Sequence, residues 1–289
     1  MKKPYIKYLA ALIMFGSNGI IAKQIALGSY EIVLTRTLIG SVFLVLIFLL
    51  TKQKVTSLKN RTHVILVVCS GAAMGISWMF LYEAYAQMGV SIASLAYYCG
   101  PVLVMMLSPV LFREKLTWVK ISGFLAVIIG MLLVNQSALM GGKASWGLVF
   151  GVLSAVMYAF MVVLNKKAAS VTGLENSVIQ LIASFMTVAV FVGLKEGFNI
   201  SIEPGSVLPI LVLGVINTGL GCYLYFSSIG KLPVQTVAVC GYLEPLSALI
   251  FSAVFLMEKL ELIQISGAVL ILGGAAFGAF PRKAMNNEK

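Results

Sequence analysis

Residues 113–133 read REKLTWVKISGFLAVIIGMLL, and residues 257–277, which lie 144 positions further along the chain, read MEKLELIQISGAVLILGGAAF. At the same offset Tyr98 matches Tyr242, and Pro101 matches Pro245. Self-similarity at a fixed offset is the mark of an internal repeat, so the chain reads as two copies of one unit. The identical positions within the two segments are Glu114 with Glu258, Lys115 with Lys259, Leu116 with Leu260, Ile121 with Ile265, Ser122 with Ser266, Gly123 with Gly267 and Gly130 with Gly274.

The composition sets the environment of these two copies. Sixty per cent of the 289 residues are hydrophobic and only 11% are charged, whereas soluble domains are about 25% charged. A helix needs about 20 apolar residues to cross the hydrocarbon layer, and such stretches recur between short polar breaks. We therefore predict an all-α polytopic membrane protein with ten transmembrane helices, and we count the first as a span rather than as a removable signal. The expected spans are 5–27, 30–51, 63–87, 90–112, 117–135, 146–165, 174–194, 206–229, 232–256 and 260–280.

The positive charges predict the orientation of these spans. With the N-terminus in the cytoplasm, sixteen of the 21 Lys and Arg residues fall on the inner side, as the positive-inside rule expects. Both termini are therefore predicted to be cytoplasmic, in a multi-pass protein of the cell (inner) membrane, and the net charge of +11 requires no nucleic-acid partner. The five remaining positive residues are Lys23, Arg36, Lys143, Lys195 and Lys259.

Because each copy holds five spans, an odd number, the second copy must cross the membrane in the opposite sense to the first. The predicted organisation is a first five-helix repeat at 1–135, a linker at 136–145, a second and inverted repeat at 146–281, and a cytoplasmic tail at 282–289. Inverted repeats are a hallmark of secondary transporters, whose substrate site lies near the middle of the membrane between the repeats.

Two motifs carry a resemblance to a known family. One is FGSN at 15–18, in the first span, and the other is the doublet P(x)12EKL(x)4ISG, which begins at Pro101 and again at Pro245. With the inverted ten-span arrangement, they resemble the drug/metabolite transporter superfamily, in its EamA-type ten-helix form. The resemblance covers essentially the whole chain and implies transport of a small solute, such as an amino acid, another metabolite or a choline-like cation. Members of the family often carry Trp where this chain has Phe15.

The sequence offers little for enzyme chemistry. The chain has no Asp, its single histidine is His63 in a basic loop, and it contains no GxxxxGK[ST] phosphate loop. Asp-containing triads and histidine metal clusters are therefore excluded, and we predict no enzymatic activity, no cofactor and no metal. We interpret the four cysteines as small buried hydrophobic residues. They are Cys69, Cys99, Cys222 and Cys240.

Two acidic residues lie away from the ends of the spans. Glu244 lies beside Pro245 in the ninth span, and Glu83 lies in the stretch WMFLYEAYAQ. A charged group inside the bilayer is costly and normally faces the bundle interior. Each of the two could couple transport to protons or recognise a cationic group. The structural alternative is that it accepts hydrogen bonds at a helix break or at the membrane interface.

Aromatic and amide side chains in the spans are the substrate-binding candidates. A mid-span aromatic residue can line a cavity, or it can enclose a quaternary ammonium by cation–π attraction, whereas one at the end of a span is simply an interfacial anchor. A buried amide can bind substrate or merely cross-link helices. The substrate-binding candidates are Asn18, Trp78, Tyr82, Tyr98, Tyr158, Asn217 and Tyr242.

Three further charged residues are interpreted as structural. Arg36 follows Glu31 by five residues, and we expect a local ion pair that snorkels outward. Glu114 and Glu258 occupy equivalent places between the fourth and fifth spans and between the ninth and tenth. We expect each of them to cap the turn of a helix hairpin.

The leading hypothesis is an alternating-access secondary transporter that exports a small amphipathic metabolite such as an amino acid, either coupled to protons or driven by the solute's own gradient. Its expected partners are the small-molecule substrate and the lipid bilayer, and its oligomeric state is left open, with a monomer among the alternatives. Uptake of a choline-like quaternary amine is the alternative within the transporter class. A membrane enzyme and a channel or structural subunit are the other classes considered.

Overall fold

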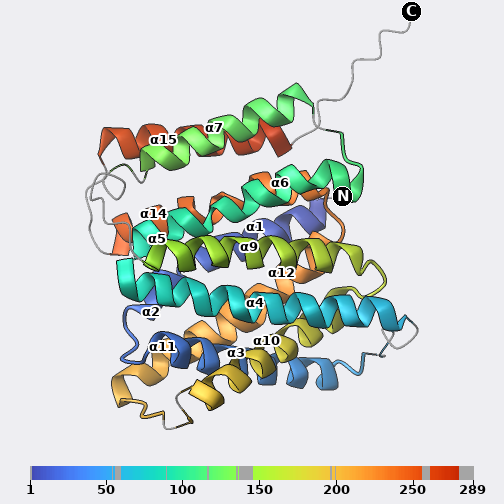
Figure 1. Ribbon diagram of the computed structural model, residues 1–289, viewed down its shortest axis with the longest axis vertical. Helices are drawn as coiled ribbons and strands as arrows, with labels where there is room; N and C mark the ends of the chain where they lie inside the picture. Colours follow the sequence, from blue (N-terminus) through green and yellow to red (C-terminus); the bar gives the residue numbers. More distant parts are fainter. Residues whose placement is uncertain are drawn as a thin grey trace, which may run out of the picture.

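The computed structural model describes residues 2–53, 55, 60–88, 90–115, 117–134, 136, 146–195, 197–198, 200–255 and 261–279. Within these ranges the chain consists of helices joined by short turns, and none of these residues forms a strand (Figure 1). The all-helical prediction is therefore confirmed. The predicted tail at 282–289, and all of the predicted linker except Gln136, lie outside the described residues.

The helices follow the expected spans closely. In the first half they are α1 (Lys2–Gly16), α2 (Asn18–Ala22), α3 (Ser29–Leu50), α4 (Arg61–Met88), α5 (Val90–Tyr97), α6 (Cys99–Phe112) and α7 (Trp118–Val134). In the second half they are α9 (Trp146–Lys167), α10 (Gly173–Lys195), η2 (Pro204–Ser206), α11 (Val207–Leu211), η3 (Val212–Leu220), α12 (Gly221–Ile229), α13 (Val234–Gly241), α14 (Leu243–Phe255) and α15 (Leu262–Ala279). Of these, η2 is a 3₁₀ turn and η3 is a π-helical segment.

Among the residues that the structure describes, six helical stretches are long and apolar enough to cross a membrane. They are Lys3–Ala22, Ser29–Leu50, Arg61–Met88, Trp146–Lys167, Gly173–Lys195 and Pro204–Ile229. The fourth and ninth predicted spans differ from the prediction, because each is divided into two shorter helices. The predicted fifth and tenth spans correspond to α7 and α15, whose apolar cores are shorter than those of the six.

Both divisions have the same cause at the same place in the repeat. Helix α5 ends before Tyr98, and α13 ends before Tyr242. Each break lies three residues ahead of a proline, Pro101 or Pro245. Since proline has no N–H, it cannot bond the carbonyl four residues earlier, and its ring clashes with that carbonyl. An interruption of a membrane helix near its middle leaves backbone groups that can serve a binding site.

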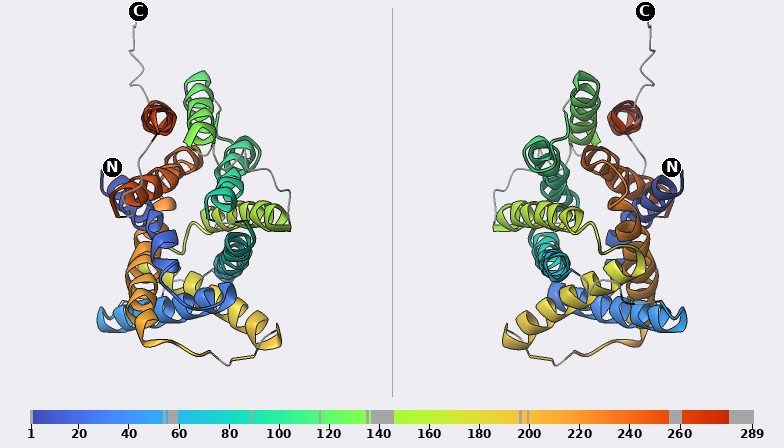
Figure 2. Two further views of the ribbon diagram at one scale, coloured as in Figure 1. Left: turned by 90° about the vertical axis from the view of Figure 1, so that its left-hand side faces the viewer. Right: turned by 90° about the vertical axis from the view of Figure 1, so that its right-hand side faces the viewer.

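The two halves interleave rather than lying side by side as separate bodies. Helix α4 of the first half packs against α9 of the second, and α1 of the first half packs against α12 of the second. The helices of the two halves therefore pack directly against each other. The pair α7 and α15 lies at one edge of the molecule, where it packs against α13 and α14 (Figures 1 and 2).

Glycine contacts between α7 and α15 are reciprocal. A Cβ added at Gly130 would lie 2.5 Å from the carbonyl oxygen of Gly267, and one at Gly274 would lie 2.5 Å from the carbonyl oxygen of Gly123. These four glycines are the matched pairs of the repeat. The two helices can therefore approach this closely only because both carry glycine at the contact.

The outer surface of the bundle is apolar. Large side chains such as Trp118, Val110 and Leu194 are exposed, which suits a surface in contact with lipid. Two of the four cysteines also lie on the surface: Cys69 and Cys99 are exposed, whereas Cys222 and Cys240 are buried. The prediction of burial is therefore wrong for the first two, because an apolar span has a lipid-facing side as well as a buried one.

Candidate functional site

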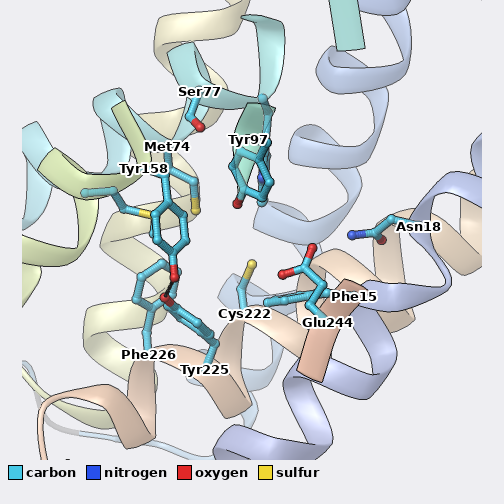
Figure 3. Close-up of a pocket in the computed structure, with 12 residues that line it drawn as sticks. Phe15, Asn18, Met74, Ser77, Tyr97, Tyr158, Cys222, Tyr225, Phe226 and Glu244 are labelled. Atoms are coloured by element: carbon cyan, nitrogen blue, oxygen red, sulfur yellow. Dashed lines mark hydrogen bonds between the residues drawn. The ribbon is translucent and has the colours of Figure 1, made fainter. Parts of the chain in front are cut away.

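A pocket lies in the middle of the bundle, with about 460 Å³ of empty space, open solvent at its mouth included. The first half supplies residues of α1, α2, α4 and α5 to its wall, and the second half supplies residues of α9, α12 and α14. The pocket is therefore built between the two halves. Its lining residues are Phe15, Asn18, Met74, Ser77, Trp78, Tyr97, Tyr158, Met161, Cys222, Tyr225, Phe226 and Glu244 (Figure 3).

The FGSN motif at 15–18 builds one side of this pocket. Phe15 packs its ring beside that of Tyr225, with centroids 5.9 Å apart. Gly16 lets α1 approach α14, since a Cβ there would lie 2.9 Å from the carbonyl oxygen of Glu244. Ser17 interrupts the helix and donates its hydroxyl to the carbonyl of Met14. The chain can then turn so that Asn18 lines the pocket.

Asn217 holds this interruption in place. Its side-chain nitrogen donates to the carbonyl of Met14 at 2.9 Å, to the hydroxyl of Ser17 at 2.8 Å and to Oδ1 of Asn18 at 2.9 Å. Because Oδ1 of Asn18 is occupied in this way, its amide nitrogen is directed toward the carboxylate of Glu244 (Figure 3). Asn217 is therefore placed as a cross-link behind the pocket, and Asn18 as part of its wall.

Among the described residues of the pocket wall, Glu244 supplies the one carboxylate. It lies in the first turn of α14, directly after the break at Tyr242, and its oxygens point into the space between Asn18 and Cys222 (Figure 3). The repeat offset of 144 places Gly100 at the equivalent position of the first half. A Cβ at Gly100 would lie 2.7 Å from Cδ1 of Tyr158, so that position is filled by an aromatic ring instead.

Arg36 is a functional candidate that the sequence analysis missed. Its side chain is only 1% exposed. Nε donates to the hydroxyl of Thr218 at 2.9 Å, and Nη1 donates to the hydroxyl of Tyr82 at 2.7 Å. The guanidinium lies over the ring of Trp78, 4.3 Å from its centroid, an arrangement that attracts a cation to an aromatic face.

The expected ion pair of Arg36 with Glu31 is therefore wrong. Glu31 instead accepts the backbone N–H of Gly28 at 2.7 Å and so closes the start of α3. Arg36 is close enough to Glu244 for the two charges to interact. Trp78 lines the pocket, and Arg36 stacks on the ring of Trp78 without lining the pocket itself. The guanidinium is therefore separated from the pocket by the Trp78 side chain.

The predicted site residues divide into two groups. Asn18, Trp78, Tyr158 and Glu244 all line the pocket. The other predicted residues make their contacts outside the pocket wall.

Tyr82 holds Arg36, and Tyr242 donates its hydroxyl to the carbonyl of Tyr98 at 2.9 Å, which joins the two helix breaks. Both Tyr98 and Tyr242 are buried. Glu83 accepts a hydrogen bond from Nε2 of Gln87 at 2.8 Å, one turn later on α4 and near the end of that helix.

Several wall residues were not among the predictions. Tyr97, not its neighbour Tyr98, lines the pocket, because the break at Tyr98 turns the following residues away. Tyr225 could have been found as one of the tyrosines of the second half. Met74, Met161, Cys222 and Phe226 give no sequence signal that separates them from ordinary core residues.

One end of the bundle is closed by contacts made by Lys and Glu side chains. Lys7 donates to the hydroxyls of Tyr223 at 3.3 Å and Ser227 at 3.4 Å, and Lys166 donates to the carbonyls of Ile229 and Leu232. This is the end that the charge bias predicts to be cytoplasmic.

At the same end, Glu114 caps a helix of the other half. Oε1 accepts the N–H of Val234 at 2.7 Å, and Oε2 accepts the N–H of Gln235 at 3.1 Å. The free N–H groups at a helix start favour such an anion. Glu114 is thus a cap, but of α13 in the other half rather than of its own hairpin turn. Its counterpart Glu258 lies outside the described residues.

The pocket wall offers hydrogen-bonding and aromatic groups for binding. Across the described ranges, no three His, Cys or Glu side chains are grouped closely enough to hold a metal ion. The described lining of the pocket combines one carboxylate, one amide, one serine hydroxyl, the hydroxyls of three tyrosines and a set of apolar aromatic and sulfur-containing side chains. Such a wall can surround a small molecule that has an apolar body and a charged or hydrogen-bonding end.

A bundle of long apolar helices with an apolar surface and a pocket between two interleaved halves is the fold of a multi-pass membrane protein. The family model described as the EamA-like transporter family matches twice, at residues 2–136 and 145–279. The chain therefore belongs to the EamA-like transporter family.

Relatives in bacteria agree with this assignment. The Bacillus subtilis "Uncharacterized transporter YxxF" is 26% identical over 98% of this chain and 91% of its own length. A "Probable amino-acid metabolite efflux pump" of Salmonella typhimurium is 26% identical over 76% of this chain and 79% of its own length. A solved crystal structure matches the fold with a TM-score of 0.80, at 17% identity, over 95% of this chain and 96% of that one.

Proposed function

We propose that this protein is a secondary transporter that exports a small amphipathic metabolite, an amino acid being the leading candidate, by alternating access. The observation that carries the proposal is the pocket between the halves, in which Glu244 supplies the one carboxylate of the described lining and is surrounded by aromatic side chains. An ammonium group would pair with the carboxylate, and an apolar side chain would lie against the rings.

Alternating access would require two halves that can exchange conformations. We propose ten spans in two inverted repeats, with the boundaries 1–135, 136–145, 146–281 and 282–289 given above. The reciprocal glycine contacts of α7 and α15 support this arrangement, because a two-fold axis makes each contact occur twice. The equivalent breaks at Tyr98 and Tyr242 support it as well, since broken helices at matching places are a feature of such transporters.

Glu244 is the proposed coupling residue. A carboxylate in a pocket that opens alternately to the two sides could take up a proton on one side and release it on the other, or it could exchange a proton for the cationic end of the substrate. Glu83 is a weaker candidate, because it lies near the end of α4 and accepts a hydrogen bond from Gln87.

The location and direction of transport are also proposals. The charge bias favours the inner membrane with cytoplasmic termini, and the relatives named as probable amino-acid metabolite efflux pumps favour export over uptake. Substrate binding rather than chemistry is favoured by a pocket without a nucleophile–base pair or a metal cluster among the described residues.

The test uses purified protein in proteoliposomes. A thermal-shift screen against amino acids identifies ligands, because a solute that binds only the folded form raises the melting temperature. Transport of the best ligand is then measured under an imposed pH gradient. Glu244→Gln should abolish the gradient-driven component and leave the protein folded, whereas Glu83→Gln, the matched control, should retain it. Unchanged gradient dependence in Glu244→Gln would overturn the coupling role.

Uptake of a choline-like quaternary amine is the second candidate, and the aromatic wall favours it. Tyr97, Tyr158 and Tyr225 line the pocket that contains the Glu244 carboxylate, and rings around a single anion suit a cation without N–H donors. Tyr158→Leu should then weaken a quaternary amine strongly and an apolar amino acid less. Equal effects on the two solutes would count against this candidate.

A further inference from the structure

A second cavity lies beside the central pocket. It contains about 280 Å³ of empty space, open solvent included, and is formed where α9 and α12 end and α10 begins. These helix ends belong to the side that is closed by the contacts of Lys7 and Lys166. The lining residues are Asn165, Ala168, Ala169, Val171, Thr172, Asn176, Phe226, Ser227, Gly230 and Lys231.

Phe226 separates this second cavity from the central pocket. Among the described residues, it is the one that contributes to the walls of both. Its ring is buried and packs edge-on against Tyr225, with centroids 5.1 Å apart. In Figure 3 it lies at the margin of the central pocket, beside Tyr158 and Tyr225. The boundary between the two spaces therefore includes an aromatic side chain, and a change of its rotamer would alter that boundary.

The walls of the two cavities differ in charge. The second cavity carries a cation, Lys231, together with amides and hydroxyls, whereas the central pocket carries the carboxylate of Glu244. Asn165 and Asn176 bond to each other through both of their amide groups, at 2.9 and 3.2 Å. This reciprocal pair fixes the wall opposite α12. A molecule with a positive and a negative end meets a complementary group in each space.

We propose that the second cavity is an antechamber of the substrate path and that the Phe226 ring is the gate between it and the central pocket. The antechamber receives a zwitterionic or carboxylate-bearing solute, with Lys231 facing its anionic end. This inference rests on the proposed transport function, but it concerns the route to the pocket rather than the pocket itself.

The chain provides its own probe for this gate. Cys222 lines the central pocket, one turn before Phe226 on α12. In a variant whose other three cysteines are replaced by serine, a membrane-impermeant methanethiosulfonate reports the access of solvent to this thiol. The reagent is applied to proteoliposomes, without substrate, from the side on which Lys231 lies.

Phe226→Ala should raise the labelling rate of Cys222 from that side by roughly tenfold or more, because the truncated side chain leaves a continuous space between the cavities. Phe15→Ala is the matched control. This variant also removes a phenyl ring from the wall of the central pocket, but Phe15 does not line the second cavity. The labelling rate of Cys222 from the Lys231 side should therefore stay near the wild-type rate.

A second variant acts in the opposite direction without removing a buried side chain. Gly230 lines the second cavity, and a Cβ there would have nothing within 4 Å. Gly230→Phe should therefore fold, fill the antechamber and slow both the labelling of Cys222 from that side and the transport of solute. Gly205→Phe is its control, since Gly205 also has free space around its Cβ but lies outside both cavities.

The outcomes separate this inference from the proposed function. Faster labelling in Phe226→Ala and slower labelling in Gly230→Phe support the antechamber even if no solute is transported. Labelling rates that both variants leave at the wild-type value, or labelling that occurs only from the opposite side, overturn it even if transport is observed.

Discussion

Replacing Gly274 by alanine should force α7 and α15 apart, whereas the same change at its neighbour Gly273 should not. A Cβ at Gly274 would lie 2.5 Å from the carbonyl oxygen of Gly123, and one at Gly273 would have nothing within 4 Å. The oxygen belongs to the backbone of α7 and cannot turn aside. The helices must therefore separate by about 0.5 Å to restore even the tightest ordinary contact, about 3.0 Å.

The size of the effect follows from this overlap. Overpacking a close contact costs about 1–3 kcal/mol. The gain in helix propensity from glycine to alanine, up to about 1 kcal/mol, is common to both neighbours and cancels in the comparison. Since 1 kcal/mol corresponds to roughly 2–4 °C in a chain of this size, Gly274→Ala should melt about 2–12 °C below Gly273→Ala.

The repeat makes this prediction sharper. A Cβ at Gly130 would meet the carbonyl oxygen of Gly267 at the same 2.5 Å. Gly130→Ala should therefore cost the same as Gly274→Ala to within about 0.5 kcal/mol, and the double variant should cost less than the sum, because one separation of the helices relieves both contacts. The assay is thermal unfolding of the purified protein in detergent. Equal melting temperatures for Gly273→Ala and Gly274→Ala, or a large difference between Gly130→Ala and Gly274→Ala, would refute the reasoning.

Two further predictions concern hydrogen bonds that join the two halves. Asn217→Ala removes the donor shared by three acceptors and should cost about 1–3 kcal/mol. Asn18→Ala removes only one of those contacts and should lower the melting temperature less, so equal losses would contradict the cross-linking role of Asn217. Glu114→Gln should destabilise by about 0.5–2 kcal/mol, because an amide cannot accept both of the N–H groups that start α13. Glu83→Gln should leave the melting temperature nearly unchanged, and a similar loss in both glutamate variants would argue against the cap.

The sequence predicts the long helices well, because apolar length and flanking charge determine them directly. The expected span 30–51 is α3 (Ser29–Leu50), and the expected 174–194 is α10 (Gly173–Lys195). The predicted spans did not include the divisions at Tyr98 and Tyr242, because the surrounding composition stays apolar across them. A helix break was considered only beside Pro245, as the structural alternative for Glu244. Pro101 and Pro245 were the available signal, since each removes the bond to the carbonyl four residues earlier.

The candidate site was predicted only in part, for a geometric reason. Tyr82 and Trp78 lie one turn apart on α4, yet only Trp78 lines the pocket, while Tyr82 holds Arg36. The residue type marks a side chain as suitable for a cavity, but it does not tell which side of a curved or broken helix faces that cavity. The burial of Arg36 was missed for a related reason: its partner Thr218 lies 182 positions away in the chain.

The two charged groups nearest the pocket have no counterparts across the repeat: Arg36 corresponds to Gln180, and Glu244 corresponds to Gly100. The two copies of the repeat therefore differ in chemistry, because the first supplies the guanidinium and the second supplies the carboxylate. An artificial tandem of two first halves would possess paired guanidinium groups and lack the acid, and a tandem of two second halves would have the reverse. Neither hybrid would have one guanidinium and one carboxylate near the pocket, as the native chain does. The two copies are therefore no longer interchangeable. In the proposed cycle, the inward-open and outward-open forms would therefore differ in energy even in the absence of cargo.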